Sequence, residues 1–339
     1  MFPSRREFLA GAAGTAAASL VPDAASALPA APVSKEPPSQ QAIAALFQPL
    51  PGDVAYKIHA PAVNGKPEFT VQANASKVMF IGSVFKTFVL CEALRQADSP
   101  TVTKTIAAQQ LDLDASVWSP DSASFNPPNL IGKVSERTAL EAMILHSDNT
   151  ATDMCLKHVG PDKVRAFIAS IGLKNTMIPD STRSFMGYLL GAKDYKTFTW
   201  EQVGTAANSE IVNKALNDTS SMSSTADDFV SYYSRALQGE FFQNKETLRQ
   251  FREVLSMGDA IWVMPMPLGA SVFMKGGSID VPGFHAMCGA GGMVFDDRWV
   301  YFFVALNWTA AALTDPATVQ AFAEACNRAM TMVKDGLSC

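Results

Sequence analysis

The chain has 339 residues, of which 48% are hydrophobic and 17% are charged, enough for one large globular unit or two closely joined lobes. Its 27 basic and 32 acidic residues give a net charge of −5, and no basic stripe with interleaved aromatic residues is present. Nucleic acid is therefore not expected as a partner, and the substrate is not expected to be a polyanion.

The N-terminus has the pattern of an export signal. Arg5 and Arg6 precede a short, alanine-rich apolar stretch that ends near Val21 and is followed by Ala25-Ser26-Ala27. This pattern predicts a twin-arginine (Tat) signal over residues 1–27 and a periplasmic or secreted protein. An uncleaved membrane anchor is the alternative, but the stretch is short and diluted with Gly and Thr, and no second apolar span follows. Residues 28–42 are rich in proline and predict an extended linker.

A polar pair interrupts the first long apolar run. Strands are predicted over residues 53–60 and 67–72, around an Asn64-Gly65 turn, and the run from Ile81 to Leu90 follows. In a helix that starts near Gly82, the spacing of three places the Lys86 amine one turn above the Ser83 hydroxyl. A buried lysine tends to lose its proton, so the pair suits a nucleophile with its base. A surface or capping serine is the alternative, because one such pair arises readily by chance.

Helical patterns dominate the middle of the chain, from Ser83 to about Leu237. Separate helices are predicted over residues 135–145, 149–158, 163–171 and 226–237. Ser147-Asp148-Asn149 lies in the turn between the first two, where a hydroxyl can point into a cleft. Serine, aspartate and asparagine are also favoured helix caps, and the two roles are compatible.

Strand patterns return near the C-terminus. They cover residues 271–274, 284–287, 292–295 and 299–307, and a final helix is predicted over 316–333. Lys275-Gly276-Gly277-Ser278 comes directly after residue 274, on a strand followed by Pro282-Gly283, and its two glycines indicate either a close approach to the backbone or a bulge. Strands at both ends of the chain imply one sheet built from both termini, with a helical lobe inserted and a cleft between the lobes.

The cysteines and histidines do not predict a metal site. The five cysteines form no Cys-x-x-Cys motif and the four histidines are scattered, so no metal and no cofactor is expected. Asp112 and Asp114 lack further spaced oxygen ligands for calcium, and we interpret them as part of a solvated loop. An odd number of cysteines leaves at least one thiol unpaired, and the sequence leaves open a Cys91–Cys155 or a Cys288–Cys326 disulfide.

Taken in order, three motifs resemble those of class A β-lactamases and penicillin-binding proteins. They are Ser83-x-x-Lys86, Ser147-Asp148-Asn149 and Lys275-Gly276-Gly277, and the resemblance covers most of residues 43–336. It implies an α/β fold of the α+β type: an antiparallel sheet flanked by helices, with an all-helical lobe inserted. The catalytic domain would span residues 43–339, with a sheet lobe over about 43–82 and 225–339 and a helical lobe over about 83–224.

The resemblance also implies roles for the motif residues. Ser83 would attack an amide or lactam carbonyl with Lys86 as its proton acceptor, and the chemistry would be acyl transfer through a serine ester. Ser147 would relay a proton to the leaving nitrogen, and Asn149 would hold both the substrate amide and Lys86.

The third motif would bind the substrate. Lys275 would bind the substrate carboxylate and tune Ser147, and Gly277 would line the substrate site. The backbone N–H groups of Ser83 and Ser278 would form the oxyanion hole. His285 lies near the position of a carboxylate-supporting arginine in the family, and the alternative is a satisfied core histidine.

The chain departs from the family pattern at two places. Gly276 replaces the usual Thr or Ser, which removes one hydroxyl from the carboxylate site. Residues 178–185, where a class A enzyme presents the glutamate that activates the deacylating water, contain no glutamate. Glu210, or else Glu201, is the candidate replacement. Arg183 is either a structural charge or a substrate-facing one.

The resulting hypothesis is an exported, monomeric serine hydrolase that acts on small molecules, either β-lactams or related amides and esters. As a β-lactamase it would confer antibiotic resistance. A D,D-peptidase or esterase-like relative is one alternative. The other is a β-lactam or peptidoglycan sensor that is acylated without turnover.

Overall fold

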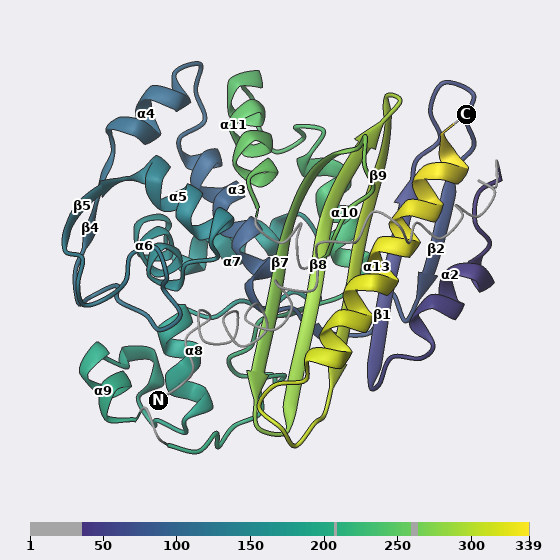
Figure 1. The fold of residues 1–339 in the computed structure, drawn as a ribbon. Helices are drawn as coiled ribbons and strands as arrows, with labels where there is room; N and C mark the ends of the chain where they lie inside the picture. Colours follow the sequence, from purple (N-terminus) through teal and green to yellow (C-terminus); the bar gives the residue numbers. More distant parts are fainter. Residues whose placement is uncertain (1–35, 207–208, 259–263, 339) are drawn as a thin grey trace, which may run out of the picture.

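The computed structural model describes residues 36–206, 209–258 and 264–338 (Figure 1). The predicted export signal lies outside these residues. Within them, no helix has both the length and the apolarity needed to cross a membrane. Helix α2 (Gln40–Phe47) begins inside the stretch predicted as linker, so that boundary was placed too late; the Ser39 hydroxyl caps it by accepting from the Ala42 N–H.

One five-stranded antiparallel sheet forms the centre of the fold (Figure 1). Its two N-terminal strands pair with three C-terminal strands, which confirms the prediction of a sheet built from both chain ends. In spatial order the strands are β2 (Phe69–Ala73), β1 (Asp53–Ala60), β9 (Arg298–Trp308), β8 (Phe284–Phe295) and β7 (Ser271–Val281).

Strand β8 corrects the sequence prediction of two strands over residues 284–287 and 292–295. It is a single strand, paired along its whole length with both β7 and β9. The glycines between the two predicted segments allow close packing: a Cβ atom on Gly291 would lie 2.3 Å from the Phe273 carbonyl oxygen. Strand β7 likewise continues to Val281, beyond the predicted end at residue 274.

The two faces of the sheet pack against different helices. Helices α2 and α13 (Pro316–Leu337) cover one face, and α10 (Ala226–Ala236) with the helical lobe covers the other. Successive residues of β9 alternate between them, with Phe302 and Val304 toward α13 and Phe303 and Ala305 toward α10.

The helical lobe surrounds helix α3, in which every residue from Lys86 to Leu94 is buried. This burial explains why the run is apolar on all sides. The remaining elements of this part of the chain are η1 (Gly82–Phe85), α3 (Lys86–Gln96), α4 (Val102–Ala108), α5 (Glu136–Leu145), α6 (Asn149–Val159), α7 (Pro161–Ser170), α8 (Thr182–Leu189), η2 (Tyr195–Thr197), α9 (Trp200–Thr205) and α11 (Lys245–Ser256), with the short strands β3 (Met79–Phe80), β4 (Gln110–Leu113), β5 (Gly132–Ser135) and β6 (Ser223–Ser224).

Four cysteines are free, buried thiols, and neither disulfide that the sequence left open is formed. The two aspartates considered for calcium have protein partners. Asp112 forms an ion pair with Lys133 across the β4–β5 hairpin, and Asp114 accepts from the Ser116 N–H.

Candidate active site

Ser83 lies in a 3₁₀ turn that leads directly into α3. Gly82, with φ +51°, sets the turn, and η1 continues into α3 at Lys86. The Lys86 N–H donates to the Ser83 carbonyl oxygen, and residues three apart in a 3₁₀ turn lie on the same side of it, so both side chains are on one face. Ser83 is half-buried and Lys86 is fully buried. The sequence predicted an α-helix here, and the tighter turn brings the pair into closer alignment.

The Lys86 amine connects the first two motifs. Its Nζ donates to the Ser147 carbonyl oxygen at 2.6 Å and to Asn149 Oδ1 at 2.8 Å, and it lies 3.2 Å from Ser147 Oγ. Asn149 Nδ2 donates to the Pro120 carbonyl oxygen at 2.9 Å, which fixes the amide with its oxygen toward Lys86. The Ser83 hydroxyl has no hydrogen-bond partner among the described residues. The Lys86 amine thus contacts two of the three residues of the second motif, Ser147 and Asn149.

Ser147 is held in an unusual backbone conformation, with φ +52°, a region that non-glycine residues seldom adopt. The neighbouring Asp148 supplies the support. Its carboxylate caps α6 by accepting from the Ala151 N–H, and it also accepts from the N–H groups of Ser124 and Phe125. The middle residue of the motif is therefore the cap, and its neighbours on either side reach Lys86.

Strand β7 lies against the 3₁₀ turn with backbone touching backbone. A Cβ atom on Gly277 would lie 2.2 Å from the Ile81 carbonyl oxygen and 2.6 Å from the Ser83 nitrogen. A Cβ atom on Gly82 would lie 2.8 Å from the Ser278 nitrogen. Because β7 is the edge strand, the backbone groups on its open side face η1 instead of another strand. Two glycines therefore permit the approach of the two backbone amides expected to form an oxyanion hole.

Lys275 is buried and shares a face of β7 with Gly277, two residues further on. Its Nζ donates to the Gly276 carbonyl oxygen at 2.9 Å. Ser278 is exposed, so this end of the strand is open to solvent.

His285 is not part of this cluster. Its ring is fully buried, its Nδ1 lies 2.7 Å from Asp280 Oδ1, and it stacks on Trp308 in the core that faces α2 and α13. His285 is therefore a buried core histidine with a hydrogen-bond partner, which was the alternative given in the sequence analysis. These contacts do not support a substrate-binding role.

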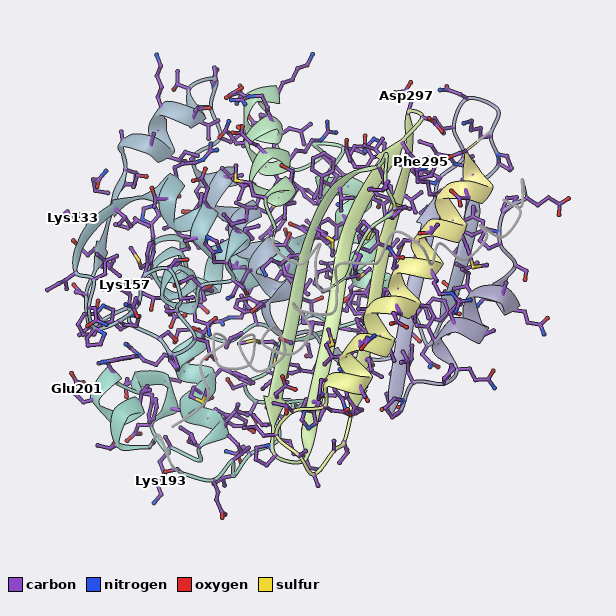
Figure 2. All side chains as sticks on the ribbon, viewed as in Figure 1. Lys133, Lys157, Lys193, Glu201, Phe295 and Asp297 are labelled. Carbon is purple, nitrogen blue, oxygen red and sulfur yellow. The ribbon has the colours of Figure 1, made fainter. Side chains whose placement is uncertain are left out.

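Neither candidate glutamate joins the cluster. Glu201 lies at the outer edge of α9 (Figure 2). Glu210 is exposed and makes no hydrogen bond or ion pair with a described residue. Two residues later, the Val212 N–H donates to the Leu189 carbonyl oxygen at the C-terminal end of α8, whereas the opposite end of α8 approaches Asn149. The two ends of α8, Thr182 and Leu189, are about 10 Å apart along the helix axis, so the segment that follows Glu210 is attached at the end of α8 away from Asn149.

The first turn of α8 occupies the place beside Asn149. Thr182 Oγ1 lies 3.4 Å from the Asn149 carbonyl oxygen and donates to Asp153 Oδ1 at 2.8 Å. Asp153 also accepts from the N–H groups of Thr182 and Arg183, and burial raises its pKa to about 6. Phe185 follows in this turn and stacks on Phe80. Residues 181–185 contain no carboxylate.

Arg183 has a structural role. Its guanidinium donates to the carbonyl oxygens of Ala115, Ser116 and Trp118, and so turns away from Asn149. The sequence had left a substrate-facing role equally open. Asp153 and the Pro120 carbonyl were not singled out from sequence, because their partners are distant in the chain and carry no local spacing signal.

The second motif thus bonds to Lys86, and the third lies against the turn that carries Ser83. The comparisons with known proteins agree with this arrangement. The chain matches the sequence profile of the beta-lactamase enzyme family over residues 38–328 and belongs to that family. A search of curated proteins found no match.

Among solved structures, the fold is similar to that of class A beta-lactamases. TLA-3 extended-spectrum beta-lactamase is 18% identical, with a TM-score of 0.66 over 87% of this chain and 98% of that one. A class A beta-lactamase from Bacteroides cellulosilyticus is 18% identical, with a TM-score of 0.65 over 88% and 97%. A variant of PBP-A, solved as an acyl-enzyme complex with penicillin G, is 14% identical, with a TM-score of 0.62 over 88% and 96%.

Proposed function

We propose that the protein is a serine hydrolase that opens β-lactams, or related amides and esters, through an ester on Ser83. The observation that carries this proposal is the Lys86 amine, which stands over Ser83 and bonds to Ser147 and Asn149. Lys86 takes the Ser83 proton as the hydroxyl attacks the carbonyl carbon. Ser147 then delivers a proton to the leaving nitrogen as the amide bond breaks.

The oxyanion is stabilised by the N–H groups of Ser83 and Ser278, which Gly82 and Gly277 allow to approach. Ser83 also lies at the N-terminal end of the helix formed by η1 and α3, where the helix dipole favours negative charge. Lys275 attracts the substrate carboxylate, although the hydroxyl usually present at position 276 is missing.

The absence of a carboxylate from the first turn of α8 favours a second candidate function, that of a β-lactam or peptidoglycan sensor. In that protein Ser83 would be acylated and the ester would persist. PBP-A, a protein of similar fold whose variant was solved as a penicillin G acyl-enzyme, illustrates that such esters form on this fold.

Intact mass spectrometry distinguishes the two functions. The purified chain is incubated with penicillin G and with a cephalosporin, and both the protein mass and the opened product are followed over time. A transient adduct with accumulating product supports the hydrolase. A stable adduct without product supports the sensor. No adduct with either compound contradicts both functions as stated for β-lactams. Ser83→Ala, which must remain unmodified, is the control.

We further propose that the chain is exported through its twin-arginine segment and acts as a monomer outside the cytoplasm. Replacing Arg5 and Arg6 together by Lys is expected to retain the protein in the cytoplasm, as measured by cell fractionation. Export of the double variant at the normal level would contradict the proposal. Sedimentation of the exported protein as a dimer would contradict the monomer.

A further inference from the structure

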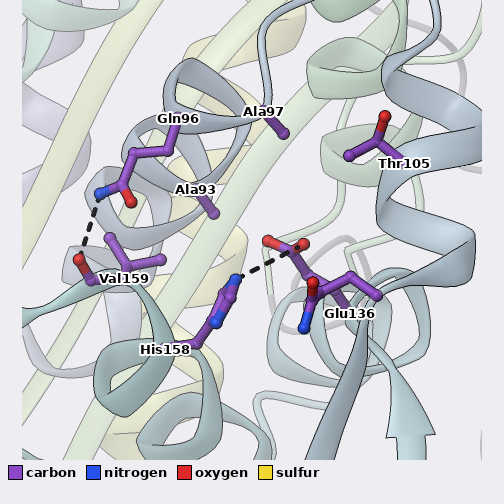
Figure 3. A pocket seen from close by; sticks show the side chains of 8 residues that line it. Ala93, Gln96, Ala97, Thr105, Glu136, His158 and Val159 are labelled. Atoms are coloured by element: carbon purple, nitrogen blue, oxygen red, sulfur yellow. Dashed lines mark hydrogen bonds and ion pairs between the residues drawn. The ribbon is translucent and has the colours of Figure 1, made fainter.

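A cavity separate from the Ser83 cluster lies where α3, α4, α5 and α6 meet (Figure 3). Its volume is about 200 Å³. It is lined by Ala93, Gln96, Ala97, Thr105, Gln109, Glu136, His158 and Val159. We call it the Glu136 cavity. Lys86 begins α3 and Gln96 ends it, so the cavity lies at the far end of that helix, about 15 Å along the helix axis from the Lys86 backbone.

Glu136 is the unexplained group of this cavity. Its side chain is 5% exposed, and its carboxylate accepts no hydrogen bond from any described residue. His158 Nε2 lies 3.7 Å from Oε2, which is too long for a hydrogen bond but within the range of an ion pair when the imidazole is protonated, and Figure 3 marks this pair with a dashed line. Asp148 and Asp153, also buried, each accept three hydrogen bonds. Burial raises the pKa of Glu136 to about 7.

The lining indicates what would satisfy this carboxylate. Burial and Lys163 lower the pKa of His158, so the imidazole is mainly neutral near pH 7 and supplies little positive charge. Ala93, Ala97 and Val159 give an apolar wall, while Thr105 and Gln109 add polar groups. An apolar cavity of about 150 Å³ can hold benzene, so this volume admits a molecule of that size with one charged substituent.

We propose that the Glu136 cavity binds a small organic cation, a primary ammonium group on a short apolar body, with the ammonium on the Glu136 carboxylate. A metal ion fits less well, because the described residues contain no group of three potential metal ligands. The ammonium replaces the hydrogen bonds that Glu136 lacks, and the apolar body covers the alanines.

The test uses benzylammonium and its neutral isostere benzyl alcohol, titrated into the whole chain by calorimetry at about pH 8, above the pKa of Glu136. We expect one benzylammonium per chain, bound at least about tenfold more tightly than benzyl alcohol. Glu136→Gln is expected to lose at least about tenfold in affinity. Glu324→Gln, the same substitution at an exposed site on α13, is expected to change nothing.

Ala97→Leu provides a second variant, because the larger side chain fills the cavity while the Glu136 carboxylate is retained. It is expected to abolish binding, so the proposal stays testable even if Glu136→Gln folds poorly. Equal affinity for the alcohol, unchanged affinity in Glu136→Gln, or no binding by the unaltered chain would each overturn the proposal. Zinc chloride is titrated in parallel, and stoichiometric zinc binding that requires His158, without ammonium binding, would also overturn it.

Discussion

At the scale of single residues, the site depends on one amine that serves two motifs. The Lys86 Nζ contacts Ser147 and Asn149 while its chain position places it over Ser83. Removing the amine therefore removes the proton acceptor and, at the same time, the group that orients the second motif.

Lys86→Met is expected to lower the rate of Ser83 acylation by about 10²–10⁴-fold, the usual contribution of a positioned base. The rate is measured as adduct formation by rapid-quench mass spectrometry. Lys104→Met, an exposed lysine on α4, is the matched control. Acylation of Lys86→Met at the original rate would show that another group accepts the proton.

Gly277→Ala tests the contact between β7 and η1. The added methyl group would lie 2.2 Å from the Ile81 carbonyl oxygen and 2.6 Å from the Ser83 nitrogen, so the strand must move away. We expect acylation to fall by at least about 10²-fold, as for loss of an oxyanion-hole donor. Gly204→Ala on α9, where a Cβ atom meets nothing within 4 Å, should acylate normally. A fully active Gly277→Ala would disprove this close approach.

At the scale of elements, two charged side chains at helix starts affect stability in opposite ways. Arg183 holds the 115–118 segment to α8, and Glu136 begins α5 from inside a cavity. The hydrogen bonds of Arg183 stabilise the fold, whereas the buried charge of Glu136 lowers the free energy of unfolding at neutral pH.

Arg183→Ala is expected to lower the free energy of unfolding by about 1–3 kcal/mol, because three carbonyl oxygens lose a charged donor. The measurement is urea unfolding followed by circular dichroism. Arg328→Ala on α13 serves as a control for loss of an arginine elsewhere. Equal stability of Arg183→Ala and the unaltered chain would mean that water replaces these bonds at no cost.

Glu136 makes stability depend on pH. Its pKa rises from 4.5 in the unfolded chain to about 7 in the folded one, so the folded state binds the proton more tightly. The free energy of unfolding therefore decreases as the pH rises from 4.5 to 7, by roughly 3 kcal/mol for this group. Glu136→Gln is expected to flatten this part of the profile and to be the more stable form above pH 7. Parallel profiles for the two proteins would contradict this assignment.

Sequence patterns predicted the elements whose signals are local. The Ser83–Lys86 spacing, the helices predicted over residues 135–145 and 226–237 and the first β-hairpin have signals within a few residues, and these helices and strands are present. Strands β4 and β5 were missed because they are short and pair across about twenty residues of intervening chain. The contacts of Arg183 and His285 were undecidable for the same reason: their partners are set by the tertiary fold.

At the scale of the whole molecule, cohesion comes from two apolar cores on opposite faces of the sheet, without disulfide bonds among the four described cysteines. Burial raises the pKa of Cys91, Cys155, Cys288 and Cys326, which keeps these thiols protonated and unreactive.

The thiols give a direct test of this arrangement. Adding a reductant should leave the melting temperature unchanged within about 1 °C, whereas loss of a native disulfide typically costs about 2–5 kcal/mol. Thiol titration should detect at least these four groups in denaturant and none of them rapidly in the folded protein. A lower melting temperature in reductant would show a disulfide that the structure lacks.

The strand order has a consequence for how the chain matures. Every residue placed in the Ser83 cluster lies between residues 82 and 278, yet β9, which joins the N-terminal hairpin to β8, is not complete until Trp308. A nascent chain that ends just after the third motif lacks β8 and β9, so its β1 is paired with β2 alone. Such long-range pairing is slow, so the sheet closes only after nearly the whole chain has left the ribosome. The sheet that carries the third motif is therefore expected to be completed late, after synthesis of nearly the whole chain.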